Sequence, residues 1–367
     1  MKHHSIAFGS PGRYIQGEGE LYRLPEHAAG FGKKIFAVID EFFFDDYSKS
    51  LNETCRAKGA SFDAYRYSVE ITKERIHEAA DQAEGFGADV ITGIGGGKTI
   101  DTAKAAASVL GLPLIIVPTS ASTDAPTSAM SVIYNDRHEH DDVWYYRKNP
   151  DLVLVDTRII ADAPPRFLIS GMGDALATAY EGRASIRSGS PNYIEQSSGP
   201  YFASRTAVGI AELCRDTILQ NGRAAKEAAV RHEVTKELEA VVEANTLMSG
   251  LGFENVGCAG SHVICNGISR LPGGEKALHG EKVAFGILCQ LTAEQAPEAE
   301  LAELRSFYLD VGLPLTLEDL GIEASDENID KISRDAKNTE WTREPFELSD
   351  EDVCESIRRT ERDGLLW

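Results

Sequence analysis

The sequence has no long apolar run, no secretory start and no paired cysteine motif. None of its hydrophobic stretches approaches the roughly 18 residues that a helix needs to span a bilayer. The start, MKHHSIAFGSPGRY, carries a basic residue but no apolar segment of the signal-peptide kind. The 6 cysteines are scattered without a C-x-x-C pair, which favours free thiols over a disulfide framework. We therefore expect a cytoplasmic protein with no membrane segment.

Positive charge is also scarce. The chain has 37 Lys and Arg residues against 58 Asp and Glu residues, which gives a formal net charge of -21 at pH 7. Such an acidic surface repels nucleic acid and anionic membranes, so neither is expected as a partner. The 367 residues are 42% hydrophobic and 26% charged, which is typical of a globular protein with room for two domains.

The first 160 residues alternate short apolar segments with helical patterns. This alternation predicts βαβ units and a mostly parallel sheet. The expected strands cover 34–40, 61–67, 88–95, 112–119 and 150–157, and the clearest helical patterns between them cover 73–87 and 99–111. A segment rich in hydroxyl side chains, 117–134, follows one of these strands. We expect it to be a loop at the carboxyl end of the sheet, where open α/β sheets bind ligands.

The pattern becomes helical after the Pro164-Pro165 pair, which we take as a boundary between domains 1–163 and 164–367. One helical face is predicted by the spacing of four apolar residues, Met172, Ala175, Leu176 and Ala179. The pattern of 236–252 also predicts a helix, and this segment ends in glycine, a common C-terminal signal of helices. Beyond residue 320 the chain is acidic, which predicts short solvated helices.

The stretch DVITGIGGGKTIDTAK (89–104) places three glycines at a strand-to-helix turn. A glycine inside a regular element costs about 1 kcal/mol, so Gly95, Gly96 and Gly97 need a reason. Backbone N–H groups at a helix N-terminus can hold a diphosphate, and glycine lets it approach. The stretch matches neither G-x-G-x-x-G nor a P-loop. Two interpretations therefore stay open: a pyrophosphate site, or a tight turn that packs the helix on the sheet.

Asp40 stands at the end of the predicted strand 34–40. A carboxylate there can accept hydrogen bonds from the ribose hydroxyls of NAD and repel the 2′-phosphate of NADP. It can equally cap the helix that begins at the next residue. The residue alone does not decide between the two roles.

Three polar residues lie in apolar surroundings. Asp174 belongs to an apolar helical pattern, His262 has small and apolar neighbours, and His279 opens a helix after a glycine loop. A buried carboxylate needs a partner, and a divalent cation would satisfy all three groups. They are far apart in sequence, so two core histidines remain the alternative. The other histidines have polar neighbours and are expected at the surface: His3, His4, His27, His77, His138, His140 and His232.

Taken together, the motifs resemble the metal-dependent polyol and iron-containing alcohol dehydrogenases, a family related in fold to dehydroquinate synthase that includes the glycerol dehydrogenases. The resemblance rests on SPGRYIQG, GIGGGKTIDTAKA, PTSASTDAPTSAMSVIY, NPDLVLVDT, APPRFLISGMGDALAT, EAVVEANTLMSGLGFE and HGEKVAFG, in this order. It implies an N-terminal Rossmann-like α/β domain that binds NAD and an all-helical C-terminal domain for metal and substrate. NAD and the metal would lie in a cleft between them, in a homo-oligomer.

The resemblance also implies individual roles. Gly95, Gly96, Gly97 and Lys98 correspond to the pyrophosphate turn, Asp101 to a further NAD residue, and Asp40 to the acid at the adenosine ribose. The loop that lines adenine, ribose and nicotinamide corresponds to Thr119, Ser122, Ser128, Met130, Val132 and Tyr134. The catalytic set corresponds to Asp124, which would bind the polyol, and to the metal ligands Asp174, His262 and His279.

The resemblance implies NAD-dependent oxidation of glycerol, or a close vicinal diol, at the secondary carbon to dihydroxyacetone. One divalent metal would act as Lewis acid: Zn²⁺, with Fe²⁺ also admitted by the donors. Two departures concern the substrate side. Cys265 replaces the second histidine of the family's GGLAAAHAxHNG run, and KNTEWTREPF (337–346) replaces its ETIHN segment. Alternatives are a dehydrogenase or reductase for another hydroxy compound, such as a 2-hydroxy acid or amino alcohol, or a catalytically silent NAD-binding paralogue.

Overall fold

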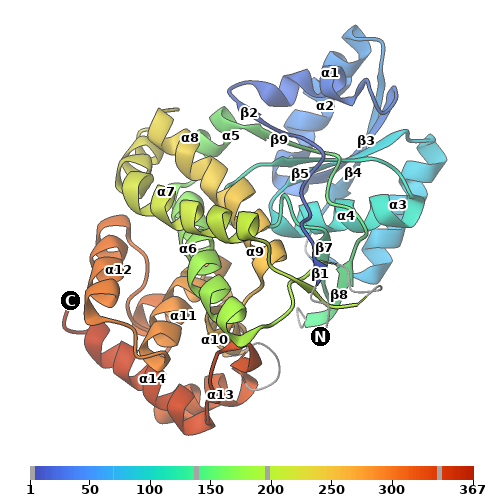
Figure 1. The fold of residues 1–367 in the computed structure, drawn as a ribbon. Helices are drawn as coiled ribbons and strands as arrows, with labels where there is room; N and C mark the ends of the chain where they lie inside the picture. The colour runs from blue at the N-terminus through green and yellow to red at the C-terminus, as the bar shows by residue number, and fades with distance from the viewer. Residues whose placement is uncertain (1–4, 69, 136–139, 195–198, 337–340) are drawn as a thin grey trace. The chain divides into compact units, whose positions relative to one another are not determined.

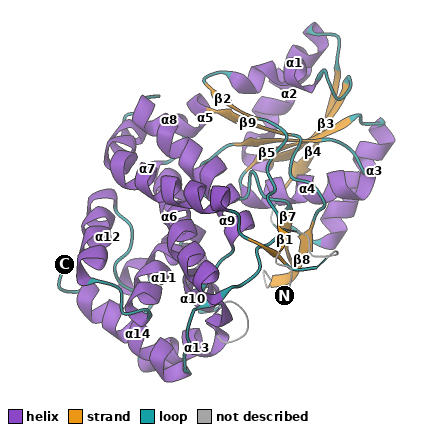
Figure 2. Ribbon diagram, viewed as in Figure 1, coloured by secondary structure: helices purple, strands orange, loops and turns teal. Residues whose placement is uncertain are grey.

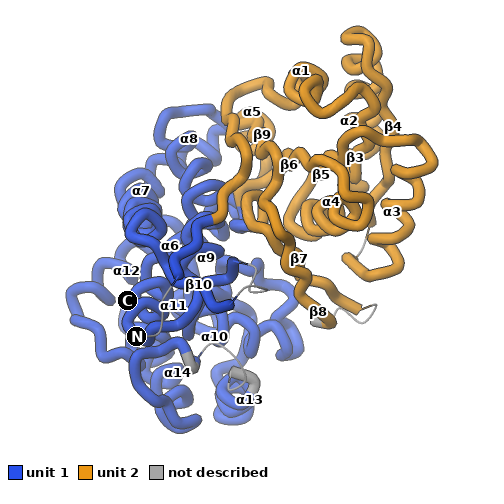
Figure 3. Tube along the Cα trace, turned by 45° about the vertical axis from the view of Figure 1, so that its right-hand side comes forward, with its two compact units in different colours: residues 1–8, 122–124, 164–367 blue, residues 9–121, 125–163 orange. Residues whose placement is uncertain are grey.

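The computed structural model describes residues 5–68, 70–135, 140–194, 199–336 and 341–367. The chain divides into two compact units, coloured separately in Figure 3. One contains residues 9–121 and 125–163 and is called the sheet unit here. The other contains 1–8, 122–124 and 164–367 and is called the helical unit. Both units are discontinuous, because residues 1–8 and the short stretch 122–124 cluster with the helices.

The sheet unit is built on a parallel sheet of six strands among its described residues (Figures 1 and 2). The strand order is β2-β9-β6-β5-β3-β4, and every neighbouring pair is parallel. The strands are β2 (Tyr14–Gly17), β3 (Lys34–Asp40), β4 (Ser61–Tyr67), β5 (Val90–Gly95), β6 (Leu114–Pro118) and β9 (Leu152–Asp156). The helices of this unit are α1 (Leu24–Ala28), α2 (Glu41–Ala57), α3 (Lys73–Phe86), α4 (Gly97–Leu110) and α5 (Thr157–Asp162).

Alternate residues of β3 face opposite sides of the sheet, as the period of two in a strand requires. Ile35 and Ile39 belong to a core shared with Leu24 of α1 and Leu51 of α2. Phe36 lies on the other side, where its ring contacts Phe86 of α3 at a centroid distance of 6.2 Å. Both faces are covered by helices, which explains why the central strands are buried and continuously apolar.

The expected strands and helices of the first 160 residues are confirmed. Strands 34–40 and 61–67 have the predicted bounds, and the other three begin two residues later than predicted and end at the predicted residue or one residue earlier. Strand β2 was not predicted, and all of 117–134 was expected to be a loop. Residues 130–134 instead form β7 (Met130–Tyr134), which pairs antiparallel with β8 (His140–Tyr145). This hairpin is held by Ile133, which packs with Ile71 and Ile76.

The helical unit is made of nine helices within the described residues, with a short parallel pair of strands, β1 (Ser5–Ile6) and β10 (Tyr201–Phe202). The helices are α6 (Pro165–Ser188), α7 (Arg205–Val230), α8 (Lys236–Glu243), α9 (Ser249–Val256), α10 (Gly260–Ser269), α11 (His279–Ala293), α12 (Glu298–Val311), α13 (Asp326–Ala336) and α14 (Asp350–Gly364). Helix α11 is buried along nearly its whole length and contacts α6, α10 and α14.

Glycines let three of these helices approach closely. A Cβ atom on Gly173 of α6 would lie 2.3 Å from the backbone oxygen of Gly280 in α11, and one on Gly280 would lie 1.8 Å from that of Ser170. On the other side of α11, a Cβ on Gly286 would lie 2.3 Å from the oxygen of Ser261 in α10. Side chains at these positions would force the helices apart, so the glycines set the distances between α6, α10 and α11.

The helical pattern of Met172, Ala175, Leu176 and Ala179 is confirmed by α6, which is buried almost all round. Two other expectations for this unit were wrong. The helical segment predicted to stop at Gly252 runs from α8 through a π-helical turn, Ala244–Met248, and α9, and ends at Gly257 with φ 105°. A Cβ on Gly252 would lie 3.0 Å from Thr178 of α6, so this glycine serves close packing. The tail does not form merely solvated helices, because α14 buries Val353 and Ile357 in the core.

The described residues include no helix that is long and apolar enough to cross a membrane. All six cysteines are free and buried, as the absence of paired motifs predicted.

Candidate active site

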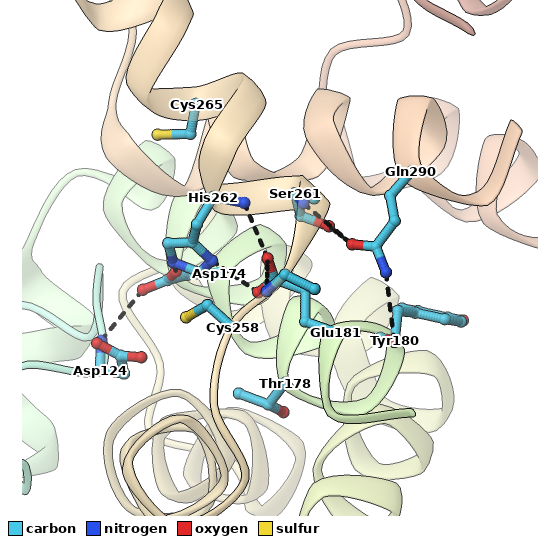
Figure 4. A network of polar contacts seen from close by, with 12 residues as sticks. Asp124, Asp174, Thr178, Tyr180, Glu181, Cys258, Ser261, His262, Cys265 and Gln290 are labelled. Carbon is cyan, nitrogen blue, oxygen red and sulfur yellow. Dashed lines mark hydrogen bonds and ion pairs between the residues drawn. The ribbon is translucent and has the colours of Figure 1, made fainter. Parts of the chain in front are cut away.

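The three candidate metal ligands, which come from three different helices, meet in the helical unit. Asp174 lies on α6 beside Gly173, His279 is the first residue of α11 beside Gly280, and His262 lies in the first turn of α10. The close helix contacts made by these glycines bring the side chains together. Figure 4 shows His262 and Asp174 pointing toward one another.

The candidate ligand atoms of Asp174, His262 and His279 lie close to one another. Oδ1 of Asp174 lies 3.5 Å from Nε2 of His262 and 3.4 Å from Nε2 of His279. Asp174 is 1% exposed, yet its Oδ1 has no hydrogen-bond partner within the part of the chain that the structure describes. An orphaned buried carboxylate oxygen is costly, and a cation between it and the two imidazoles would satisfy it. The residues therefore fit a divalent metal.

Electrostatics at the site favour a bound cation. Burial alone would raise the pKa of the Asp174 carboxyl, but His279 and His262 outweigh it and hold the pKa below its usual range. Burial likewise opposes charge on His279, yet Cys265 and then Asp174 raise its pKa to about 10. Without a metal, the neighbouring groups thus raise the pKa of both imidazoles and favour their protonated form, and metal binding must release these protons.

The N-terminus of α10, which carries His262, is capped by buried side chains. Oε1 of Glu181 accepts hydrogen bonds from the backbone N–H groups of Ala259 and His262, both at 2.9 Å. Glu344 accepts one from Gly260 at 3.2 Å, and Gln290 accepts one from Ser261 at 3.0 Å. All four N–H groups at this helix start are satisfied without solvent, which holds the backbone of His262 in one position.

Two further residues lie close to the three ligands. The backbone N–H of Asp124, from the short stretch 122–124, donates to Oδ2 of Asp174 at 3.2 Å. Sγ of Cys265 lies 3.5 Å from Nδ1 of His279, on the ring side away from Asp174. The side chain of His279 is 42% exposed, whereas that of His262 is 16% exposed. The cluster is therefore open to a small molecule on the His279 side.

The glycine turn of the sheet unit separates into two kinds of position. A Cβ on Gly93 would lie 2.7 Å from Cβ of Ala103, and one on Gly95 would lie 2.7 Å from Cβ and Oγ1 of Thr99. These two glycines are required by packing of α4 on β5. Among the described residues, a Cβ on Gly96 would meet no atom of a non-neighbouring residue within 4 Å, and its φ of -84° suits any residue. Neither packing nor backbone conformation explains why residue 96 is glycine.

Gly96 faces a cavity of about 260 Å³. The cavity lies at the carboxyl ends of β3, β4 and β5, where the strand order changes direction between β3 and β5, the usual ligand position in open α/β sheets. Its lining residues are Asp40, Glu41, Tyr67, Ser68, Gly96, Gly97, Lys98 and Thr99. Helix α4 starts there without a side-chain cap on its N-terminal N–H groups. The cavity thus offers backbone donors and a lysine to an anion.

Asp40 has a structural role as well as a place in this cavity. Its Oδ1 accepts the backbone N–H of Phe42 at 3.0 Å and so caps α2, and its Oδ2 lies 3.3 Å from Oγ1 of Thr99. Nζ of Lys98 forms a 2.6 Å ion pair with Glu70, which is buried, and lies 5.3 Å from the ring centroid of Tyr134.

Asp101 does not line the cavity. Its carboxylate accepts hydrogen bonds from the buried Nζ of Lys104 at 3.1 Å and from the backbone N–H of Val132 at 3.0 Å. Lys104 also donates to Oγ of Ser128 and to the backbone oxygen of Met130. These contacts tie α4 to β7, and for Asp101 the assignment to NAD stays a prediction. Thr119 is buried beside the turn, where its N–H donates to Gly95. Ser122, by contrast, clusters with Asp124 in the helical unit.

The remaining histidines are mostly as expected. His77 and His232 are exposed. His27 is not a surface residue, because its side chain is 14% exposed and pairs with Glu20 at 2.7 Å. His3, His4, His138 and the side chain of His140 lie outside the described residues, as do the first four residues of the C-terminal departure, 337–340.

Three buried carboxylates near the candidate sites were missed: Glu70, Glu181 and Glu344. Glu181 had a signal, because it follows Asp174 by seven residues and so lies on the same face of an apolar helix. Glu70 stands between Val69 and Ile71, and Glu344 lies in a polar segment. Neither short stretch marks a buried carboxylate.

Comparison with known proteins agrees with this geometry. The family model for iron-containing alcohol dehydrogenase matches residues 11–157. The glycerol dehydrogenase of Thermotoga maritima is 42% identical over 368 residues, which cover 97% of each chain. The chain belongs to the iron-containing alcohol dehydrogenase family. The glycolaldehyde reductase of Halobacterium salinarum is 38% identical, with 97% of each chain covered. A probable glycerol dehydrogenase structure from Sinorhizobium meliloti 1021 matches with a TM-score of 0.92 at 36% identity, covering 99% of this chain and 100% of that one.

Membership in this family defines the enzyme class. The chain is an NAD-linked oxidoreductase that acts on a CH–OH group of a small alcohol and uses a divalent metal.

Proposed function

We propose that this member of the family oxidises glycerol, or a close vicinal diol, at the secondary carbon. The products are dihydroxyacetone and NADH: the hydrogen on carbon leaves as hydride to NAD, and the hydroxyl hydrogen leaves as a proton. The observation that carries the proposal is that Nε2 of His262 and Nε2 of His279 both face Oδ1 of Asp174, a buried oxygen with no hydrogen-bond partner among the described residues.

We assign Asp174, His262 and His279 as the protein ligands of one ion, with zinc as its identity. Three protein ligands leave coordination positions for substrate oxygens, and two imidazoles with one carboxylate are typical donors of catalytic zinc. When bound, the cation supplies Lewis-acid chemistry that lowers the pKa of a coordinated alcohol. Asp124 would orient a substrate hydroxyl, because its backbone is held against Asp174 by a 3.2 Å hydrogen bond.

The cavity at the glycine turn is assigned to the diphosphate of NAD. Gly96 and Gly97 would present the uncapped N–H groups of α4, and Lys98 would add a positive charge. Asp40 would accept the adenosine ribose hydroxyls with the carboxylate that caps α2. The sheet unit would therefore supply the diphosphate and ribose residues, and the helical unit would supply metal and substrate residues.

A panel of substrates tests the proposal. Glycerol, propane-1,2-diol, a 2-hydroxy acid and an amino alcohol are offered with NAD and either Zn²⁺ or Fe²⁺, and NADH absorbance is followed. Glycerol or the diol with zinc is expected to give the highest kcat/KM. Turnover confined to the hydroxy acid or the amino alcohol would contradict the substrate, and no NADH from any substrate would favour a silent paralogue.

Reduction of a small hydroxyaldehyde is the second candidate. The Halobacterium salinarum relative is named a glycolaldehyde reductase, and Cys265 stands behind His279 where the resemblance leads us to expect a histidine. Glycolaldehyde with NADH therefore belongs in the same panel, and a higher kcat/KM for it than for glycerol would favour this candidate.

Assembly and location are proposals of the same kind. We propose a homo-oligomer, which light scattering would test, and a cytoplasmic location, supported by six free cysteines.

A further inference from the structure

A buried carboxylate stands directly behind one of the proposed metal ligands. Glu181 is 1% exposed, and its Oε2 lies 2.7 Å from Nδ1 of His262. Its other oxygen accepts the backbone N–H groups of Ala259 and of His262 itself. Figure 4 shows this side chain reaching His262 from α6. Glu181 thus contacts both the backbone and the ring of the same histidine.

We propose that Glu181 is a positioning residue that holds His262 in the tautomer required for metal binding. The inference rests on the proposed function, since it takes His262 as a ligand. An ionised carboxylate can only accept hydrogen bonds, so the proton shared with the ring must reside on Nδ1. The lone pair is then left on Nε2, which is the atom that faces Asp174. A carboxylate behind a metal-bound histidine orients the ring and makes it a stronger donor.

Glu181→Gln inverts this arrangement while preserving the fold. The two backbone N–H groups require an acceptor, so the amide oxygen takes the place of Oε1. The amide NH₂ group then faces Nδ1 and donates to it. Nδ1 becomes an acceptor, and the ring proton moves to Nε2, where it blocks the metal. Both buried N–H groups keep their partner, so the metal-free variant is expected to unfold within a few degrees of the wild type.

The same helix end provides a matched control. Glu344 is also buried and caps α10 through the N–H of Gly260, and this hydrogen bond does not involve the ring of His262. Glu344→Gln makes the same substitution at the same helix terminus without altering the ring's partner. Any effect that arises merely from weakening the helix cap would appear in both variants.

Zinc affinity, measured by competition with a fluorescent chelator on the full-length chain, tests the inference. Glu181→Gln is expected to bind Zn²⁺ roughly 10- to 100-fold more weakly, whereas Glu344→Gln binds as the wild type does. Equal affinity of Glu181→Gln and the wild type, or equal losses in both variants, would overturn the inference. His262→Ala separates it from the proposed function: if this variant kept zinc at wild-type affinity, the ligand assignment itself would fail.

A measurement on the wild type needs no variant to fold. In the zinc-loaded chain, two-bond ¹H–¹⁵N correlation spectra of labelled histidines are expected to show His262 protonated at Nδ1 and unprotonated at Nε2. The opposite tautomer would overturn the inference. So would two zinc ions per chain with the second on Glu181, Cys258 and His262, whose ligand atoms lie within 4.8 Å of one another.

Discussion

Replacing Gly96 by alanine separates a glycine needed for a ligand from one needed for the fold. The new methyl group meets no atom of a non-neighbouring described residue within 4 Å, and the backbone at φ -84° accepts alanine without strain. Loss of backbone freedom in the unfolded chain stabilises the protein by about 0.4–1 kcal/mol. Alanine is a poorer N-cap than glycine, which offsets this by about 0.5–1 kcal/mol. The free energy of unfolding should therefore change by less than about 1 kcal/mol.

The cofactor is expected to respond differently. The methyl group would occupy the space in which a diphosphate approaches the uncapped N–H groups of α4, so we expect NAD to bind at least about tenfold more weakly, or about 1.4 kcal/mol. Isothermal titration with NAD measures this, and urea unfolding measures stability.

Two control variants are compared with Gly96→Ala. Gly85→Ala, on α3 with open space around the new atom, should leave NAD affinity unchanged. Gly95→Ala places a methyl 2.7 Å from Thr99 and should cost about 1–3 kcal/mol of stability through overpacking. If Gly96→Ala bound NAD as tightly as the wild type, the assignment of this turn to the diphosphate would be refuted.

Three further variants test other parts of the account. Asp40→Ser keeps the cap on α2 but removes the charge, so the ratio of kcat/KM for NADP to that for NAD should rise several-fold; an unchanged ratio would exclude Asp40 from the ribose site. Burial, and then Glu294, raises the pKa of Glu344 to about 8 from 4.5, so the folded chain holds a proton that the unfolded chain has lost. Stability should therefore fall as pH rises from about 5 to 8, and urea unfolding across this range should show a shallower fall for Glu344→Gln; equal slopes would contradict the raised pKa. Gly280→Ala would need α6 and α11 to retreat until a contact of 1.8 Å exceeds 3.0 Å, so zinc affinity should drop more than about tenfold in the chelator assay; wild-type affinity would show that this glycine does not set the ligand spacing.

Strands and crossover helices of the sheet unit were predictable because their signal is local. Residues 34–40 alternate between two buried faces, and Gly87 and Gly111 end α3 and α4 in the left-handed conformation that favours glycine. The hairpin of β7 and β8 was missed, because its hydroxyl-rich approach reads as loop and its partner strand is polar. Its stability comes from packing on Ile71, which no local pattern reveals.

Residue patterns alone suggested the candidate site but left alternatives open, and only the resemblance assigned the roles. Nothing local in the sequence indicates that α6 and α11 approach at Gly173 and Gly280, and this approach is what places Asp174 beside His279. The position of Asp101 in the motif suggested a cofactor residue. The motif did not indicate that its carboxylate accepts hydrogen bonds from Lys104 and from the backbone of Val132. Side-chain partners depend on tertiary packing, which motif spacing does not encode.

The central claim is that Asp174, His262 and His279 hold the one divalent ion on which alcohol oxidation depends. The most direct measurement combines metal analysis of the purified chain with NADH production from glycerol, before and after chelation, in the wild type and in His279→Ala. We predict one ion per wild-type chain, loss of turnover on chelation, recovery with Zn²⁺, and neither ion nor turnover in His279→Ala, while NAD binding persists in every sample. Full turnover in the metal-free wild type, or a His279→Ala chain that keeps both its ion and its activity, would contradict the account.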